Sequence, residues 1–313
     1  MIPGRSRALA GAGVLGLALL PLAVRNDAAL DVLALAGLYV TLALSLNVIV
    51  GYAGLLNQGH AAFYAAGAYT YALLASDQFH LHVSPWLLLP LSGAVAAVFG
   101  LLLGRPVLRL RGDYLAIVTL GFGEIMRITL NNLSAITNGP NGIINVDHPR
   151  LGGLHFGVGV VPYYYLFWFV ALVTMGAMKR LEDSRIGRAW MAVREDEMAA
   201  ATQGINVTAL KLGAFATGAA LAGVCGGLYA CKQGHVAPES FSFMESVMML
   251  AMVVLGGMGT VRGPVLGAVT LTILPYLLLG LQTYRVLLFG AALVVMMLFR
   301  PQGLLGRRGG FAA

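Results

Sequence analysis

Charged residues are scarce in this chain of 313 residues. Asp, Glu, Lys and Arg together make up 11% of the sequence, whereas a soluble domain carries about 25%. Apolar residues make up 58%, and a water-soluble fold of this composition would expose more apolar surface than its few charges could keep in solution. The shortage of charge therefore excludes an ordinary soluble domain and favours a protein embedded in a lipid bilayer.

Cysteine is nearly absent as well, because Cys225 and Cys231 are the only two in the sequence. Six residues apart on one helix, their side chains would point to roughly opposite sides. We therefore expect neither a disulfide nor a metal pair, and each thiol should behave as a small apolar group. The spaced His and Cys patterns of metal-binding proteins are also missing, so no metal site is predicted.

Sequence patterns typical of enzymes are missing too. No G-x-x-x-x-G-K-[ST] occurs, so the chain has no phosphate-binding loop with which to hydrolyse ATP. H-E-x-x-H and G-x-S-x-G are absent, and no pairing of a nucleophile with a general base can be recognised. These absences predict a protein that is not an enzyme and needs no cofactor.

Apolar stretches about as long as a bilayer-crossing helix recur along the whole sequence. They predict an all-α fold, a polytopic transmembrane helix bundle of about ten spans, with some helices broken at glycine-rich segments. We expect residues 1–313 to form a single transmembrane domain with one long cytoplasmic loop, 179–211. The predicted spans lie near 8–24, 30–50, 53–75, 85–104, 114–134, 163–178, 212–231, 244–260, 264–280 and 286–299.

The basic residues favour one orientation of these spans. The segment 179–211 alone carries Lys179, Arg180, Arg185, Arg188, Arg194 and Lys211. Cytoplasmic loops are enriched in Lys and Arg, so we predict that this segment and both termini are cytoplasmic and that the 135–162 loop is outside. The net charge of +7 is then explained by topology and anionic lipid, and no nucleic-acid partner is expected.

The predicted cytoplasmic segment 179–211 is expected to contain a short helix. Arg188 to Ala201 is rich in helix-forming residues and is predicted as one helix, which Gly204 is placed to end. Trp190 and Val193 would form a small apolar stripe beside charged residues. Such a helix can dock into a groove on a partner, but a solvated connector or a helix lying on the membrane would have the same pattern.

Part of this segment resembles a known motif. Glu197-Met198-Ala199-Ala200 followed by Gly204 is similar to the EAA motif of ABC importer permeases, and the string from Ser184 to Asn206 resembles the branched-chain amino-acid permease family. In that family this loop is the coupling helix that docks on the ATPase subunit. The residues to which the resemblance gives this role are Gly187, Arg188, Arg194, Glu197, Ala199, Ala200 and Gly204.

Four further segments resemble the same family in the same order. They are 109–124, 137–142, 211–223 and 255–268, with Asn138 standing where the family usually has glycine. The match is to the M-type subunit. It implies a permease of the bacterial inner membrane that passes branched-chain amino acids from a periplasmic binding protein to the cytoplasm. The implied partners are a second homologous permease, two cytoplasmic ATPase subunits and the binding protein. Urea and short-amide permeases share these motifs and remain an alternative.

Polar residues inside the predicted spans are functional candidates by default. Glu124 and Arg127 lie three residues apart in the fifth span, and Asn131 follows four residues later, so the three share one helix face. An internal ion pair that helps the bundle to pack would explain them. A role with substrate or in gating would as well, and the pair would also suit a secondary transporter or channel.

Two glycine-rich segments, 51–60 and 256–267, interrupt apolar stretches. Unwound backbone at membrane depth must be buried in protein or line a water-filled cavity, and transporter sites are often built from such interrupted helices. Spans 2–5 would repeat as spans 7–10 with inverted topology, although small residues also simply permit close helix packing. The pathway candidates are Asn57, Gln58, His60, Thr119, Glu124, Arg127, Asn131, Gly256, Gly257 and Gly259.

Overall fold

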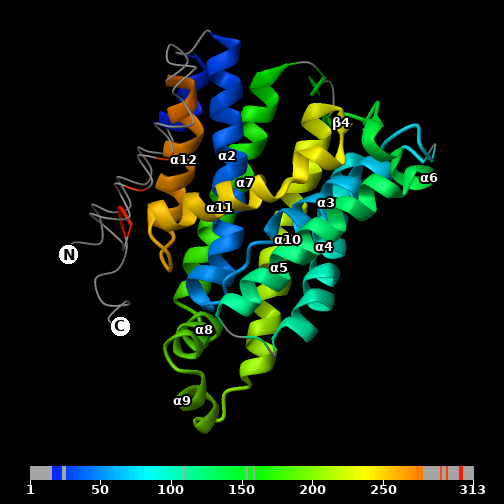
Figure 1. The fold of residues 1–313 in the computed structure, drawn as a ribbon. Coiled ribbons are helices and arrows are strands. Elements are labelled where there is room, and N and C mark those ends of the chain that lie inside the picture. Colours follow the sequence, from blue (N-terminus) through cyan, green and yellow to red (C-terminus); the bar gives the residue numbers. More distant parts are fainter. Residues whose placement is uncertain are drawn as a thin grey trace.

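The fold is a bundle of α-helices (Figure 1). The computed structural model describes residues 16–22, 26–79, 81–108, 110, 112–151, 154–157, 159–277, 290, 294 and 303–305. The helical elements are α2 Asp27–Asn47, η1 Val48–Tyr52, α3 His60–Leu74, α4 Pro85–Val107, α5 Asp113–Asn132, α6 Ser134–Thr137, η2 Gly139–Asn141, α7 Val160–Glu182, α8 Arg185–Glu195, α9 Glu197–Thr202, α10 Val207–Gln233, η3 Pro238–Phe241, α11 Phe243–Gly256 and α12 Arg262–Leu277. The strands are β1 Ile143–Ile144, β2 Arg150–Leu151, β3 Leu154–His155 and β4 His235–Val236.

Five of the described helical segments are long and apolar enough to cross a membrane. They are Asp27–Tyr52, Pro85–Val107, Val160–Glu182, Val207–Gln233 and Pro238–Gly256. The predicted all-α membrane bundle is therefore confirmed, while the number of about ten spans stays a prediction. The predicted span 286–299 lies almost wholly outside the described residues, and of span 8–24 only the helical residues 16–22 are described.

Capping residues in the sequence set several of the helix starts. The Asn26 side chain accepts a hydrogen bond from the backbone N–H of Ala28 at the start of α2, and Asn206 accepts one from Ala209 at the start of α10. Pro85 occupies the first turn of α4, where its missing N–H costs nothing. These caps satisfy backbone donors that a helix leaves unpaired at its first turn.

One predicted span is wrong in its first third. The sequence predicted a helix over 53–75, but the chain leaves the helical conformation after Ala53 and resumes it only at His60. Gly54 has a φ of +70°, which a glycine adopts readily and which no α-helix accommodates. The segment 53–59 is therefore a non-helical connection between two helices.

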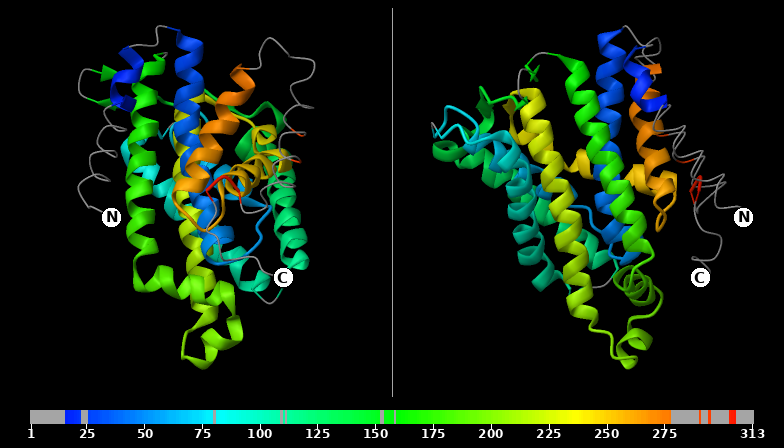
Figure 2. Two further views of the ribbon diagram at one scale, coloured as in Figure 1. Left: turned by 90° about the vertical axis from the view of Figure 1, so that its left-hand side faces the viewer. Right: turned by 180° about the vertical axis from the view of Figure 1, so that it is seen from behind.

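Small residues allow α10 to lie at the centre of one half of the bundle, packed against α3 and α4. A Cβ on Gly67 of α3 would overlap the backbone of Gly223 in α10, so these helices approach each other at backbone distance. On the other side, α2 packs against α7 and α12 (Figure 2). Glycine explains this close packing as the sequence suggested, because backbone contact requires the absence of a side chain.

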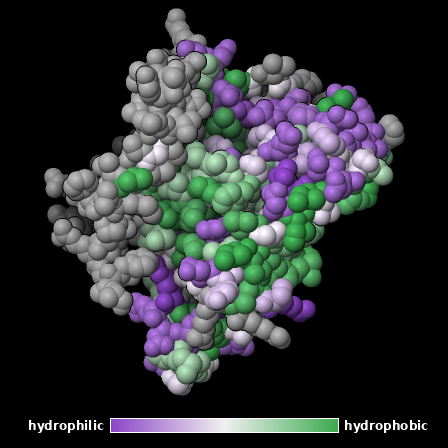
Figure 3. Space-filling view, viewed as in Figure 1, coloured by the Kyte–Doolittle hydropathy of each residue, from purple (hydrophilic) through white to green (hydrophobic). Residues whose placement is uncertain are grey.

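The two ends of the bundle differ. Helices α8 and α9 project from one end, whereas α6 and the small sheet of β1 paired with β4 lie at the other (Figure 1). On the face shown in Figure 3, apolar residues form a broad area between the ends, with polar residues gathered toward its upper right and its bottom. This distribution is what a bilayer-embedded protein requires. The segments 179–211 and 135–162 lie at opposite ends of the bundle (Figure 1).

A pattern of one long and one short helix occurs twice. In the first copy α2 and η1 are followed by the stretch 53–59 and the 15-residue α3; in the second, α10 is followed by 234–242 and the 14-residue α11. Helices α2 and α10 run in opposite directions through the bundle (Figure 1). In each copy, therefore, the short helix begins inside the bundle and not at its end.

Candidate transport pathway and coupling segment

Polar side chains gather where α3 begins. The His60 ring is fully buried; its Nε2 lies 2.7 Å from Ser45 Oγ on α2, and its Nδ1 lies 3.4 Å from Asn57 Nδ2. Asn57 is buried as well, and its Oδ1 accepts a hydrogen bond of 3.0 Å from the Gly59 N–H. The interrupted backbone is thus satisfied by buried side chains, as burial away from water demands.

Both short helices and α5 meet at this same junction. The Ala61 N–H in the first turn of α3 donates to Ser246 Oγ in the first turn of α11, at 2.9 Å. The Gln58 N–H donates to Thr119 Oγ1 of α5, at 3.1 Å. The structure therefore brings together four of the predicted pathway residues: Asn57, Gln58, His60 and Thr119.

The predicted pair on α5 is formed. Arg127 Nε donates to both carboxylate oxygens of Glu124 at 3.1 Å, and Nη2 donates to Oε1 at 2.5 Å. The side chains of Arg127 and Glu124 are 29% and 37% exposed in this single chain. Asn131, on the same helix, is half-buried. A bidentate ion pair on a partly open helix face is therefore a feature of α5.

A second acidic residue, half-buried between helices, escaped the sequence analysis. Glu245 of α11 accepts a hydrogen bond of 2.6 Å from the Tyr39 hydroxyl of α2. Among the described residues, no Lys or Arg forms an ion pair with Glu245. Its place inside the predicted span 244–260 was the available signal, since an ionisable residue within an apolar run is a functional candidate by default.

The predicted glycine break after α11 is confirmed. Gly257 and Gly259 have φ values of +115° and +77°, and a Cβ on Gly256 would overlap the carbonyl of Gly263 at the start of α12. These glycines do not join the junction around His60. They form a turn beside η1, where the buried Asn47 accepts from the Gly259 N–H at 3.0 Å and donates to the Thr260 carbonyl at 3.0 Å.

The candidate coupling segment, residues 179–211, contains two short helices, α8 and α9, where the sequence predicted one. Asp196 breaks the predicted helix 188–201, because its backbone is extended and its side chain accepts from the N–H groups of Met198 and Ala199. An aspartate is a strong N-cap residue, and here it ends α8 and starts α9. Gly204, with a φ of +80°, ends α9 as predicted.

The apolar stripe of α8 faces its own chain and not a partner. Trp190 and Val193 are buried, and Trp190 Nε1 donates to the Leu210 carbonyl at 2.7 Å. A Cβ on Gly187 would overlap the Leu181 carbonyl, so this glycine permits the tight turn from α7 into α8. The suggestion that a partner groove covers this stripe is therefore wrong.

Other parts of the same segment do face outward. Arg188 and Ala199 are exposed, as is Met198, which is 71% exposed. Ala200 is buried. The predicted coupling residues therefore divide into an exposed group and a group that packs against the chain.

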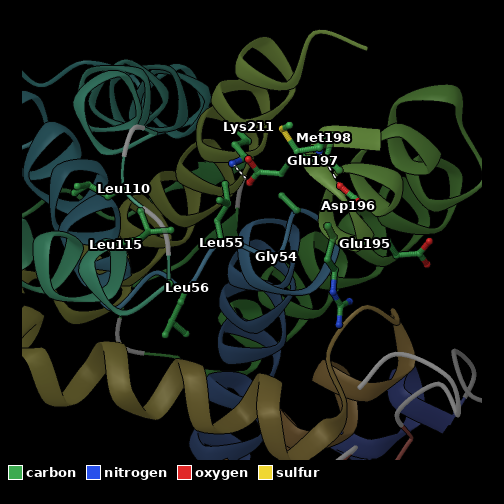
Figure 4. Close-up of a pocket in the computed structure, with 14 residues that line it drawn as sticks. Gly54, Leu55, Leu56, Leu110, Leu115, Glu195, Asp196, Glu197, Met198 and Lys211 are labelled. Atoms are coloured by element: carbon green, nitrogen blue, oxygen red, sulfur yellow. Dashed lines mark hydrogen bonds and ion pairs between the residues drawn. The ribbon is translucent and has the colours of Figure 1, made fainter. Parts of the chain in front are cut away.

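Charged residues tie the segment to the rest of the bundle. The Lys211 ammonium at the start of α10 forms an ion pair with Glu197 of α9, and the Arg194 guanidinium donates to the Gly51 carbonyl of η1. Burial lowers the pKa of the Arg194 guanidinium, although a guanidinium remains protonated in proteins. A cavity of about 310 Å³ opens between the segment and residues 53–56, walled by Leu55, Leu56, Leu115 and Met198 (Figure 4).

Apolar exterior, interrupted helices and buried polar groups at the interruptions define a polytopic α-helical membrane protein of the kind that transports solutes. Comparison with known families identifies the family of transport proteins to which the chain belongs. The family model described as "Branched-chain amino acid transport system / permease component" matches residues 28–299, and the chain belongs to this family.

Its relatives carry matching names. The chain is 46% identical to the high-affinity branched-chain amino acid transport system permease protein LivM of Salmonella typhimurium, over 88% of this chain and 69% of the relative. It is 44% identical to LivM of Escherichia coli over the same shares. Identity to the LivH permease protein of Escherichia coli is 27%, over 86% of this chain and 91% of LivH. No solved structure matches.

Proposed function

We propose that this chain is the M-type permease subunit of an ATP-driven importer of branched-chain amino acids. Membership of the permease family supports the substrate class, and its identity to LivM exceeds that to LivH. The observation that carries the proposal is the exposed α8–α9 segment with its EAA-like motif, on a chain that lacks a phosphate-binding loop. ATP must then be hydrolysed by a separate subunit, and this segment is where that subunit binds.

The implied assembly has defined sides. The end that carries α8 and α9 faces the cytoplasm and receives one of two ATPase subunits, because its Lys and Arg residues follow the positive-inside rule. The opposite end, with α6 and the β1–β4 sheet, faces the periplasm and a substrate-binding protein. A second homologous permease completes the importer, the termini are cytoplasmic, and about ten spans cross the inner membrane.

The pathway residues belong to an inverted repeat. Spans 2–5 and 7–10 are related copies, and the antiparallel long helices α2 and α10, each followed by a short helix, support this relation. The junction of the two short helices at Ala61 and Ser246 lies where transporters of this build place substrate. Asn57, Gln58, His60 and Thr119 line the pathway there, and Glu124, Arg127 and Asn131 continue it along α5.

Capture of the ATPase tests the docking surface. Ala199 is an exposed alanine on α9, and Ala135 is an exposed alanine at the other end of the molecule. A Trp at position 199 places a bulky ring on the proposed contact, so A199W should retain at least about tenfold less ATPase on affinity purification. The matched variant A135W should retain as much as the wild type.

The two variants also separate the competing function. A secondary transporter has no use for an ATPase, so a wild-type chain that captures none from cells expressing the whole system would overturn the proposal. Equal retention by A199W and A135W would remove α9 from the contact.

A further inference from the structure

Arg194 points from the coupling segment into the membrane domain. Its Nη1 donates to the carbonyl oxygen of Gly51, which lies in η1 at the end of the 26-residue helical segment Asp27–Tyr52. The carboxyl end of a helix carries a partial negative charge and unpaired carbonyls, both of which favour a cation. The contact is therefore electrostatically favourable as well as a hydrogen bond.

The chain leaves room for this one side chain. A Cβ on Gly54 would lie 2.7 Å from Arg194 Cγ, and a Cβ on Gly259 would lie 2.6 Å from Arg194 Nη1. Both glycines also have positive φ values, +70° and +77°. The Arg194 side chain thus passes between two glycine turns from different parts of the sequence, with its aliphatic part beside Gly54 and its guanidinium beside Gly259.

The contact continues beyond Gly51 through hydrogen bonds. Asn47, one turn earlier, accepts from the Gly259 N–H and donates to the Thr260 carbonyl. The segment Val48–Tyr52, which follows Asn47 and includes Gly51, is a π-helical turn. This rare conformation is found frequently at functional sites. Two sets of hydrogen bonds on the helical segment Asp27–Tyr52 therefore connect it to α8, through Arg194, and to the turn between α11 and α12, through Asn47.

We propose that Arg194 is a positioning residue that couples the ATPase-binding segment to the membrane domain and makes no contact with the ATPase. Through Arg194, a displacement of α8 moves η1 and the 257–260 turn, and with them α2 and α11. Both of these helices contact the start of α3, α2 at His60 and α11 through Ser246. Coupling between distant sites needs such a continuous physical link. The inference rests on the proposed function. It assigns binding of the ATPase to the exposed residues of the segment and not to Arg194.

The test uses the complete importer, with its ATPases, second permease and binding protein, reconstituted in vesicles. Two variants break the contact. R194A removes the guanidinium, and G259A places a methyl group where the guanidinium lies. R194K keeps a cation that can donate to a single carbonyl. R180Q is the control, because Arg180 is an exposed cation at the same end and outside the network. Three quantities are measured: ATPase retained on purification, ATP hydrolysed, and leucine imported.

R194A and G259A should retain the ATPase as the wild type does, yet import about tenfold less leucine per ATP hydrolysed. R194K should recover part of that loss, and R180Q should show the wild-type ratio. If R194A fails to accumulate in the membrane, G259A decides the question alone.

Two results would overturn the inference. One is loss of the ATPase from R194A in step with the loss of import, since Arg194 would then be a docking residue. The other is a wild-type ratio of leucine to ATP in both R194A and G259A. A wild-type chain that retains no ATPase would instead refute the proposed function itself.

Discussion

The ion pair between Glu124 and Arg127 has a measurable consequence at the scale of single residues. An uncompensated charge near the bilayer centre costs about 2.5–3.5 kcal/mol. E124Q or R127Q alone should therefore lower the amount of folded protein in the membrane. The double variant E124Q/R127Q leaves two neutral side chains and should recover most of that amount, as measured by quantitative immunoblotting of monodisperse, detergent-extracted protein.

The double variant also separates packing from transport. Normal accumulation together with normal import would limit the pair to a structural role. Normal accumulation with import abolished would place the pair in the pathway. A double variant that accumulates no better than either single one would contradict the account, because charge compensation would then not be what the pair provides.

Sequence alone predicted some of the polar residues within the apolar stretches, such as Glu124 and Arg127, but it missed Glu245 and most of the polar contacts between helices. The contact of Glu124 with Arg127 follows from three-residue spacing on one helix. Asn47 could not be assigned in this way, because its partners Gly259 and Thr260 are more than two hundred residues away. The hydrogen bond from Tyr39 to Glu245 is equally distant in sequence, so only the packing of α2 against α11 brings those two groups together.

The same limit applies to whole elements. The long helices were predicted within a few residues, because apolar runs and their flanking loops determine them. The sequence did not predict the break at Asp196, since the surrounding residues all favour helix and the break is a local competition that the cap wins. The start of α3 at His60, instead of Ala53, likewise depends on side chains that satisfy the unwound backbone from other helices.

One pH-dependent contact involves the loop 75–84, which joins α3 to α4. His82 Nδ1 lies 2.7 Å from Asp147 Oδ2, which raises the pKa of His82. A raised pKa means that the folded state favours the protonated imidazole. The contribution of the contact is thus fully present below the unfolded pKa of about 6.5 and is lost as pH rises through the folded pKa.

Hydrogen exchange can detect this change. After correction for the intrinsic exchange rates, amides near His82 and Asp147 should be more protected at pH 6 than at pH 8.5. H82N should abolish the difference, and it suits the position because asparagine tolerates the φ of +41° found there. Equal protection at both pH values in the wild type would show that the contact contributes nothing.

For the whole molecule, orientation in the membrane is the first quantity to establish. Met198 and Ile144 lie at opposite ends and are 71% and 58% exposed. In a background in which the buried Cys225 and Cys231 are replaced by alanine, M198C should be protected from a membrane-impermeant thiol reagent in intact cells. I144C should react with it. Labelling of M198C in intact cells would reverse the topology.

The central claim is that this chain carries branched-chain amino acids across the membrane at the expense of ATP hydrolysed by a partner. The most direct test is leucine uptake into vesicles that contain the complete importer, with ATP inside or absent. We predict that uptake requires ATP and is lost in G204V, since a β-branched residue at a φ of +80° is strained by about 1–2 kcal/mol and distorts the coupling segment. Uptake that continues without ATP would contradict the account. So would uptake that is driven by an ion gradient and is unchanged in G204V.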